Sequence, residues 1–312
     1  MKPFLIKTKS PLRHLLPFIQ KTRRGAWKYF DRTGCRLMIS GGRIQFLDVA
    51  LTFPENVGLA YATSLFWGGS SAYEADTSHL VASLLGQVDS FIDVGSNIGI
   101  YAVYAGVRYP NLPVYAFEPV PEIWQKNVAF HHANNLPPDR VFNLACSDSD
   151  SSQRIFFPQP DHALEEEQTA TLRPDSWQAA SSNVRCIDVK CTTLDSFFSA
   201  RGWPAGVCLL KIDVEDFEAA ALRGARSLVS RSRPWILCEI LPREHHNRET
   251  LALLTELRYV PFAITSNGLF RMASPDFSRP RELKDFLLVP SEKLHPEVFY
   301  LPVGSLKDMP IR

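Results

Sequence analysis

The stretch "FIDVGSNIGIYAVYAG", residues 91–106, decides the interpretation of the whole chain. It opens with an apolar run, turns through small residues and continues with the apolar spacing of a helix. A buried strand that leads through a glycine turn into a helix is typical of α/β proteins, whose ligands bind beyond the carboxyl ends of the strands. Gly95 and Gly99 let the backbone bend sharply and approach a ligand closely. The stretch therefore predicts a small-molecule site at its turn.

The rest of the chain repeats this alternation. From about residue 80 onward, apolar runs rich in Val, Ile and Phe alternate with helical patterns, which predicts a doubly wound α/β fold with a mostly parallel sheet and helices on both faces. The predicted strands are "SFIDVG", "VYAFEP", "RVFNLAC", "VRCIDVKC", "VCLLKIDV", "WILCEIL" and "YVPFAIT". The predicted helices lie near residues 98–108, 121–134, 193–201, 216–230 and 246–257. Residues 158–183 carry no sustained period and are predicted to form a long loop.

Composition indicates one large domain with appendages. The 312 residues are 45% hydrophobic and 21% charged, and no run of eighteen apolar residues is present to span a membrane. No small-residue cleavage site follows the apolar N-terminal segment, which argues against a secretory signal. The six cysteines form no Cys-x-x-Cys pair and are expected to be reduced packing residues. We therefore expect a cytoplasmic protein.

Charge is distributed unevenly along the chain. Residues 1–47 hold eleven Lys or Arg and a single acid, Asp31, so this segment is about +10 while the whole chain is +1. A basic arm on an acidic body suggests contact with an anionic partner, such as a membrane surface, a polyanion or the body itself. We expect residues 1–73 to form a basic arm and lead-in segment and residues 74–312 to form the enzymatic domain. Peripheral contact with an anionic membrane surface is one expectation for the arm.

The turn after residue 93 favours a ligand that bears an amino acid moiety. A dinucleotide site would show Gly-x-Gly-x-x-Gly, whereas this chain has Asp93-Val-Gly-Ser-Asn-Ile-Gly99. The acid at Asp93 would repel phosphates but receive an ammonium group, and the backbone amides of Gly95, Ser96 and Asn97 are candidates to receive a carboxylate.

A second acid stands at the end of the next predicted strand. Glu118 follows Gly99 by 19 residues, the spacing at which a carboxylate reaches ribose hydroxyls in this type of fold. Ribose together with an amino acid moiety describes S-adenosylmethionine, and we predict this molecule as the cofactor.

Several motifs together give the chain a family resemblance. "FIDVGSNIGIYAVYAG", "VYAFEPVPEIWQKN", "NLACSDSD", "TTLDSFF", "LLKIDVEDFEAAALRGA" and "DFLLVP" resemble successive motifs of the FkbM family of S-adenosylmethionine-dependent methyltransferases, over about residues 74–290. The resemblance implies a seven-stranded Rossmann-like methyltransferase sheet. One departure stands out: the family pattern usually has Gly after the Glu of "KIDVE", and this chain has Asp216.

The resemblance also implies roles for particular positions. Those that match the cofactor cradle are Asp93, Gly95, Asn97 and Gly99, Glu118 matches the ribose acid, and the run Ala145, Cys146, Ser147, Asp148 matches the adenine edge. Asp213 and Glu215 end the fourth parallel strand and Glu239 ends the strand "WILCEI", so each is a candidate base for the proton of an acceptor hydroxyl. We predict no metal site.

The predicted function is transfer of a methyl group from S-adenosylmethionine to a hydroxyl oxygen of a sugar, glycan or secondary metabolite. The hydroxyl acceptor class rests on the resemblance. The main alternative is a cofactor-binding interaction module that has lost catalysis, which Asp216 favours. A nicotinamide dehydrogenase is disfavoured by the missing glycine pattern, and nucleic-acid binding is disfavoured by the acidic body.

Overall fold

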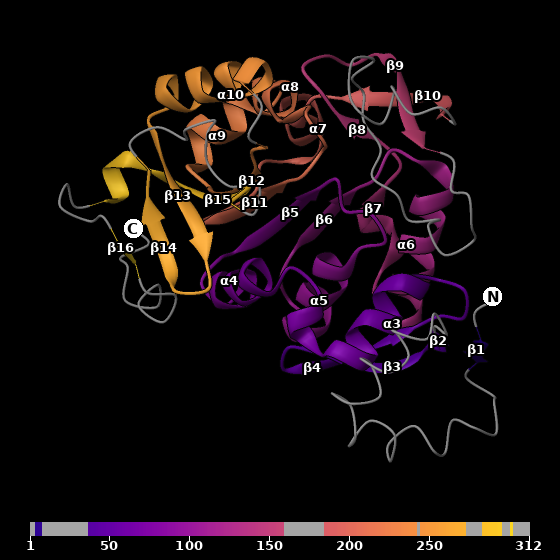
Figure 1. The fold of residues 1–312 in the computed structure, drawn as a ribbon. Helices are drawn as coiled ribbons and strands as arrows, with labels where there is room; N and C mark the ends of the chain where they lie inside the picture. The colour runs from indigo at the N-terminus through magenta and orange to yellow at the C-terminus, as the bar shows by residue number, and fades with distance from the viewer. Residues whose placement is uncertain are drawn as a thin grey trace.

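A large sheet forms the centre of the computed structural model, which describes residues 4–7, 37–158, 184–241, 244–272, 283–294 and 300–301 (Figure 1). Nine strands of the described residues build it. In spatial order they are β16 (Tyr300–Leu301), β14 (Gly268–Arg271), β13 (Tyr259–Thr265), β15 (Asp285–Pro290), β12 (Trp235–Glu239), β11 (Cys208–Ile212), β5 (Ser90–Val94), β6 (Val114–Phe117) and β7 (Val141–Phe142).

The order of these strands places a ligand site. The five strands from β12 to β7 are parallel, and β15 is antiparallel to its neighbours β12 and β13. After β5 the chain adds strands on one side through β6 and β7 and then crosses to the other side through β11 and β12. This reversal between β5 and β11 is the switch point, where α/β folds bind ligands beyond the carboxyl ends of the strands.

The predicted α/β class is confirmed, and the sheet is larger than predicted. Six of the seven predicted strands contribute to this sheet, as β5, β6, β7, β11, β12 and β13, and β15 lies between β12 and β13. Among the described residues, β14 and β16 extend the edge beyond β13, because β14 forms an antiparallel hairpin with β13 and β16 pairs with β14. The sheet described here therefore has nine strands instead of seven.

Alternate residues of the central strands enter two separate cores. On β5, Phe91 belongs to one apolar cluster and Ile92 to the other, and Leu209 and Leu210 divide in the same way on β11. Successive side chains of a strand point to opposite faces, so a strand covered on both sides is apolar throughout. This explains the continuous apolar runs in the sequence.

Helices cover both faces of the sheet, as Figure 1 shows. One face carries α4 (Ala75–Leu85), α5 (Ile100–Arg108) and α6 (Pro121–Ala133), and the other carries α7 (Leu194–Arg201), α8 (Glu218–Arg223), α9 (Arg226–Ser232) and α10 (Glu244–Glu256). The single helix predicted over residues 216–230 is wrong: it divides into α8 and α9 at Gly224. A Cβ at Gly224 would overlap the carbonyl oxygen of Ser147, so the backbones approach closely at this break.

The lead-in segment adds to one of the cores. It consists of strands β2 (Leu37–Ser40), β3 (Gly42–Phe46) and β4 (Val49–Phe53) and helix α3 (Leu59–Gly68), of which β4 contacts α5 while α3 packs on β2 and β3 (Figure 1). Phe46, Phe53 and Leu65 are buried in the same cluster as α4 and α5. Strand β1 (Phe4–Lys7) pairs in parallel with β2, and most of the basic arm lies outside the described residues. The boundary at residue 74 stays a prediction.

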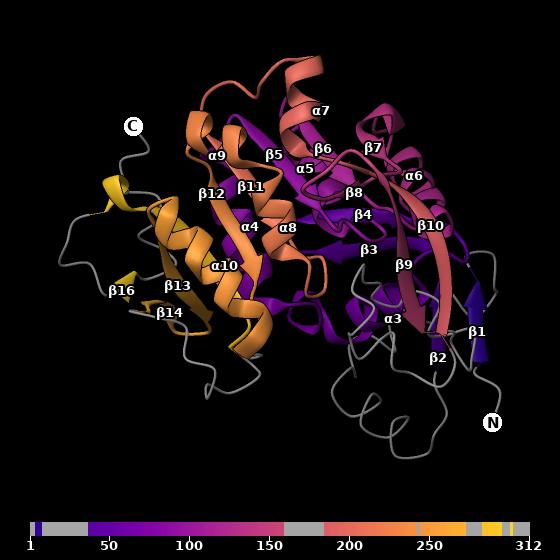
Figure 2. The ribbon, with the colours of Figure 1, turned by 90° about the horizontal axis from the view of Figure 1, so that it is seen from above.

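A separate small sheet stands beside the central one. It consists of β8 (Ala145–Cys146), β10 (Val184–Thr192) and β9 (Ser152–Pro158), and Figure 2 shows β9 and β10 at the opposite end of the molecule from β13 and β14. The predicted strand "RVFNLAC" is therefore two short strands in different sheets, and "VRCIDVKC" pairs with β9 and β8 instead of joining the central sheet. Only Pro158 of the predicted loop 158–183 is described.

Composition predicted that no segment spans a membrane and that the cysteines are reduced packing residues. Over the described ranges, no helix has both the length and the apolar content needed to cross a bilayer. Four of the five described cysteines are buried and Cys186 is exposed, and all five are free thiols.

Candidate active site

A pocket opens at the carboxyl ends of β5, β6, β11 and β12, at the switch point of the sheet. Its volume is about 1080 Å³ with the open space at its mouth included. The polar and aromatic residues in its lining are Tyr61, Tyr73, Glu74, Asp93, Ser96, Asn97, Tyr101, Phe117, Glu118, Cys146, Lys211, Asp213, Glu215, Phe217, Glu239 and Lys284. The pocket is therefore rich in carboxyl groups.

The glycine turn after β5 forms one wall of this pocket. Gly95, Asn97 and Gly99 have φ values of 77°, 51° and 88°, in the left-handed region that favours glycine and tolerates asparagine. At Gly95 the turn also passes so close to β11 that a Cβ would overlap the carbonyl oxygen of Asp213. Both features require glycine at residue 95.

Asn127, on α6, holds the turn in place. Its Nδ2 donates to the carbonyl oxygen of Asn97 at 2.8 Å and to Oγ of Ser96 at 3.0 Å. The side chain is fully buried, and a Cβ at Gly99 would overlap it. Gly99 is thus needed for packing against Asn127, and it begins α5 rather than lining the pocket.

The backbone amides of the turn are already engaged. The N–H groups of Gly95 and Ser96 both donate to the carbonyl oxygen of Phe117, at 3.0 and 2.9 Å, and that of Asn97 donates to Oε2 of Glu118 at 3.0 Å. The expectation that these three amides receive a ligand carboxylate stays a prediction. In this structure the three amides bind the turn to the end of β6.

Asp93 presents an unsatisfied carboxylate to the pocket. The residue is 1% exposed, and neither carboxylate oxygen has a hydrogen-bond partner among the described residues. Burial raises the pKa of Asp93 to about 6, against the opposing effect of the Lys211 charge. A buried carboxylate without a partner is costly, so this group favours a cationic ligand.

Glu118 is held rigidly at the end of β6. Its Oε1 accepts from the N–H of Val120 at 2.8 Å and its Oε2 accepts from Asn97, while each oxygen keeps a second lone pair. Burial raises the pKa of Glu118 to about 7, although both backbone hydrogen bonds lower it. The carboxylate is thus oriented toward the pocket and able to accept further hydroxyl donors.

A buried ion pair lies at the end of β11. Lys211 Nζ donates to Oδ2 of Asp213 at 2.8 Å. Burial alone would raise the pKa of Asp213, but the ammonium outweighs it and holds that pKa below its ordinary value. Burial likewise opposes the charge of Lys211, while Asp213, Asp93 and Glu74 together raise its pKa well above the ordinary value. Asp213 is therefore ionised and already paired with Lys211.

Glu239, at the end of β12, has one carboxylate oxygen paired and the other unpaired among the described residues. Its Oε1 contacts Nζ of Lys284, and its Oε2 is buried without a hydrogen-bond partner among the described residues. Burial, followed by the charge of Asp213, raises the pKa of Glu239 to about 8. Of the three predicted base residues, Glu239 thus carries an unused carboxylate oxygen in the pocket lining.

Glu215 completes a group of three carboxylates with Asp213 and Glu239. One carboxylate oxygen of each lies within 4.8 Å of the others, close enough to surround one cation. Glu215 has φ 49° and Asp216 has φ 70°, so the turn after β11 is left-handed at both residues. Asp216 is buried, and the described residues that line the pocket do not include it. Aspartate tolerates the left-handed conformation, so Asp216 can form the same turn as the glycine that the family pattern has at this position.

The predicted adenine edge is only partly in the pocket. Ala145 and Cys146 line it, whereas Ser147 and Asp148 do not. The N–H of Ser147 donates to the carbonyl oxygen of Thr192, and Asp148 pairs with Arg223 at 2.8 Å. The roles of all four residues of this run stay predictions.

Sequence reasoning missed several residues of the pocket. They are Glu74, Tyr61, Tyr73, Tyr101, Lys211 and Lys284. Lys211 stands inside the "KIDVE" run, and a lysine within an otherwise apolar buried strand was a signal for it. Glu74 and Lys284 lie in unrelated stretches of sequence and offered no such signal.

Fold and pocket together define a Rossmann-like α/β protein with an acidic ligand site at its switch point. Residues 93–261, more than half of the chain, match the profile of the methyltransferase FkbM domain. The chain belongs to the FkbM methyltransferase family.

Two curated relatives and two solved structures are similar to this chain. It is 30% identical over 158 residues to 31-O-demethyl-FK506 methyltransferase FkbM of Streptomyces tacrolimicus and 30% identical over 150 residues to methyltransferase 1 of Beauveria bassiana. Each match covers 44% of this chain and spans 59% and 58% of the respective relatives.

The solved structures overlap with this chain only in part. The crystal structure of methyltransferase FkbM from Methylobacillus flagellatus KT gives a TM-score of 0.38 at 16% identity, over 65% of this chain and 43% of that one. The crystal structure of precorrin-6y C5,15-methyltransferase from Geobacter metallireducens gives a TM-score of 0.35 at 10% identity. This match covers 69% of this chain and 86% of that one.

Proposed function

We propose that this protein is an S-adenosylmethionine-dependent O-methyltransferase that acts on a hydroxyl of a sugar, glycan or secondary metabolite. Family membership supports methyl transfer. The observation that carries the choice of oxygen is the unpartnered, buried Oε2 of Glu239 in the pocket lining. A hydroxyl acceptor must lose a proton as its oxygen is methylated, and this atom is available to accept it.

The residues of the pocket fit the methyl donor. When bound, S-adenosylmethionine supplies a methyl group on a positively charged sulfur. The orphaned carboxylate of Asp93 matches its ammonium group, and the fixed carboxylate of Glu118 matches the ribose hydroxyls. The glycine turn allows close approach of the ligand to the backbone at Gly95.

Glu239 would act as the base and Asp213 as a fixed charge. Asp213 is held by Lys211, so its proton affinity is lowered, while that of Glu239 is raised. A general base works best when its pKa lies near the working pH, which favours Glu239 over Asp213. Lys284 stays against Oε1 of Glu239 and leaves Oε2 to receive the proton of the acceptor hydroxyl.

The proposed function is tested by incubating the protein with methyl-labelled S-adenosylmethionine and a panel of hydroxylated sugars, glycans and natural products. We expect label to appear in at least one acceptor as a base-stable methyl ether. Calorimetry on the same protein measures cofactor binding separately. Tight cofactor binding with no transfer to any acceptor would favour the interaction module over the enzyme.

Replacing Glu118 with alanine should weaken S-adenosylmethionine binding by about 1.5–3 kcal/mol, the worth of hydrogen bonds to a charged group, or about tenfold to a hundredfold. Calorimetry measures this change. Glu122→Ala is the matched control, because Glu122 lies on the same segment but pairs with Arg185 at the surface. Unchanged affinity in a folded Glu118→Ala variant would remove Glu118 from the site.

The affinity for S-adenosylmethionine should also depend on pH. Asp93 and Glu118 have pKa values raised to about 6 and about 7, and both are proposed to bind the ligand as carboxylates. Protonation removes these charges, so affinity should rise as the pH increases through this window and fall by up to about tenfold per pH unit and per group below it. Calorimetric titrations at several pH values measure how steeply the affinity changes with pH. The Asp93→Asn variant should lose the dependence at the acidic end of this window. A flat profile in the wild type would contradict these roles.

A further inference from the structure

Lys211 and Asp93 stand side by side near the ends of two central strands. They are register partners on the parallel strands β11 and β5, and both line the pocket. Neighbouring strands lie about 4.7–4.9 Å apart, so the two side chains leave the sheet close together. Neither carboxylate oxygen of Asp93 has a hydrogen-bond partner among the described residues. An acid and an ammonium therefore face the pocket together without a hydrogen bond between them.

The ammonium of Lys211 has donors left for a ligand. Its Nζ donates to Oδ2 of Asp213 at 2.8 Å, lies 5.4 Å from the centre of the Tyr101 ring and has no further hydrogen-bond acceptor among the described residues. An ammonium carries three N–H donors, so Asp213 occupies only one of them. Burial would lower the pKa of Lys211, but the neighbouring acids, Asp213 first among them, hold it above the ordinary value. Lys211 can therefore hold Asp213 and bind an anionic group at the same time.

The other ammonium of the described lining and the amides of the glycine turn are engaged elsewhere. Lys284 contacts Oε1 of Glu239 at the end of β12. The N–H groups of residues 95–97 donate to the end of β6. Within the described lining, Lys211 is therefore the cation placed beside Asp93.

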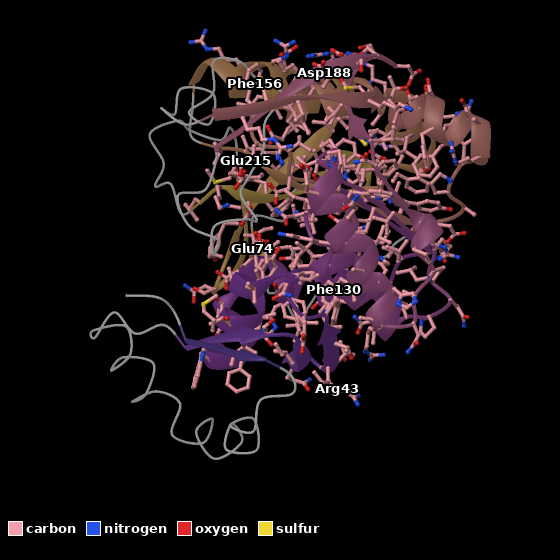
Figure 3. The ribbon with its side chains drawn as sticks, turned by 90° about the vertical axis from the view of Figure 1, so that its right-hand side faces the viewer. Arg43, Glu74, Phe130, Phe156, Asp188 and Glu215 are labelled. Carbon is pink, nitrogen blue, oxygen red and sulfur yellow. The ribbon has the colours of Figure 1, made fainter. Side chains whose placement is uncertain are left out.

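Acids surround Lys211, so its charge decides whether an anion binds there. Asp213 is its hydrogen-bond partner, and Figure 3 shows Glu74 and Glu215, both in the pocket lining, on the same side of the molecule. Without the ammonium, a ligand carboxylate would meet charges of its own sign, and like charges repel more strongly in a partly buried site than in water. Removal of the Lys211 charge should thus weaken a ligand that carries a carboxylate and spare one that lacks it.

We propose that Lys211 binds the carboxylate of the methionine moiety of S-adenosylmethionine, while Asp93 binds its ammonium group. This inference rests on the proposed function and adds how the amino acid moiety of the cofactor is recognised. An amino acid carries its ammonium and its carboxylate on one carbon atom, so opposite charges on neighbouring strands match the distance between the two groups. Lys211 thereby separates the cofactor from nucleosides that lack a carboxylate.

The experiment compares two matched nucleosides by calorimetry, so it does not depend on turnover. S-adenosylhomocysteine, the product left after methyl donation, carries both the ammonium and the carboxylate. Decarboxylated S-adenosylhomocysteine keeps the ammonium and lacks the carboxylate. We expect the wild type to bind S-adenosylhomocysteine about tenfold to a hundredfold more tightly, the worth of hydrogen bonds to a charged group.

A double variant assigns this preference to Lys211. Lys211→Met alone would leave Asp213 buried without its counterion, so it is combined with Asp213→Asn, which removes both charges of the ion pair together. The double variant should bind the two nucleosides with equal affinity, whereas Asp213→Asn alone should keep the preference. Lys190→Met is the control, because Lys190 is exposed on β10 and does not belong to the described pocket lining.

A measurement on the wild type covers the case in which the double variant does not fold. The nitrogen NMR signal of the buried Lys211 ammonium should shift on addition of S-adenosylhomocysteine and much less on addition of the decarboxylated analogue. Equal shifts with the two nucleosides would count against the inference.

Two further results would overturn the inference. They are equal binding of the two nucleosides by the wild type and a preference for the carboxylate that survives in the folded double variant. The second result would assign the carboxylate to another donor, such as the amides of the glycine turn. Failure of the wild type to bind either nucleoside would instead contradict the proposed function, and this inference would fall with it.

Discussion

A Gly95→Ala variant should lose S-adenosylmethionine binding and be destabilised by about 2–5 kcal/mol. The left-handed φ of 77° costs an L-residue about 1–2 kcal/mol, and forcing a methyl group into a packed contact costs about 1–3 kcal/mol more. The new Cβ would overlap the carbonyl oxygen of Asp213, which belongs to backbone and cannot rotate away. Relief requires the turn to move away from β11. Chemical denaturation and calorimetry measure the two effects.

Gly202→Ala is the control that separates the strain of a left-handed φ from the overlap of a new Cβ with neighbouring atoms. Gly202 ends α7 with φ 95°, and a Cβ there would meet no described atom within 4 Å. The Gly202→Ala variant should be destabilised only by the cost of the left-handed backbone conformation, about 1–2 kcal/mol. Its cofactor binding should be unchanged. Equal destabilisation of the two variants, with cofactor binding retained in Gly95→Ala, would show that the approach between the turn and β11 is not required.

Glu239→Gln should reduce turnover on the true acceptor by about a hundredfold to ten-thousandfold, the typical contribution of a positioned general base. Glutamine keeps the shape of the side chain and its contact with Lys284 but cannot accept the hydroxyl proton. In the wild type, turnover should rise with pH as Glu239 ionises and level off above its pKa of about 8. The variant should lose this rise. Steady-state rates across pH measure both effects.

Glu215→Gln is the matched comparison, since Glu215 belongs to the same group of three carboxylates. It should reduce turnover less than Glu239→Gln and keep the rise with pH, moved to lower pH because the charge of Glu215 helps to raise the pKa of Glu239. Calorimetry with S-adenosylmethionine should give similar affinities for both variants and the wild type. A larger loss in Glu215→Gln would transfer the role of base to Glu215.

The sequence by itself determined the local geometry around the glycine turn. Apolar runs indicated buried strands, and Gly95 and Gly99 indicated a sharp turn into a helix. The acids Asp93, Glu118 and Glu239 could be placed because each ends a predicted parallel strand, and such ends meet at one edge of the sheet. These features depend on residues close together in the chain, so period and spacing encode them.

Only the tertiary structure decided how the pocket is charged and which of its groups are already used. The amides of Gly95 and Ser96 are occupied by Phe117, and Asp213 by Lys211, while Asp93 and one oxygen of Glu239 are left without partners among the described residues. Glu74 and Lys284, which are far apart in the chain, also line the pocket. A carboxylate's proton affinity depends on its burial and on the charges that folding brings beside it, and neither quantity is encoded in local spacing.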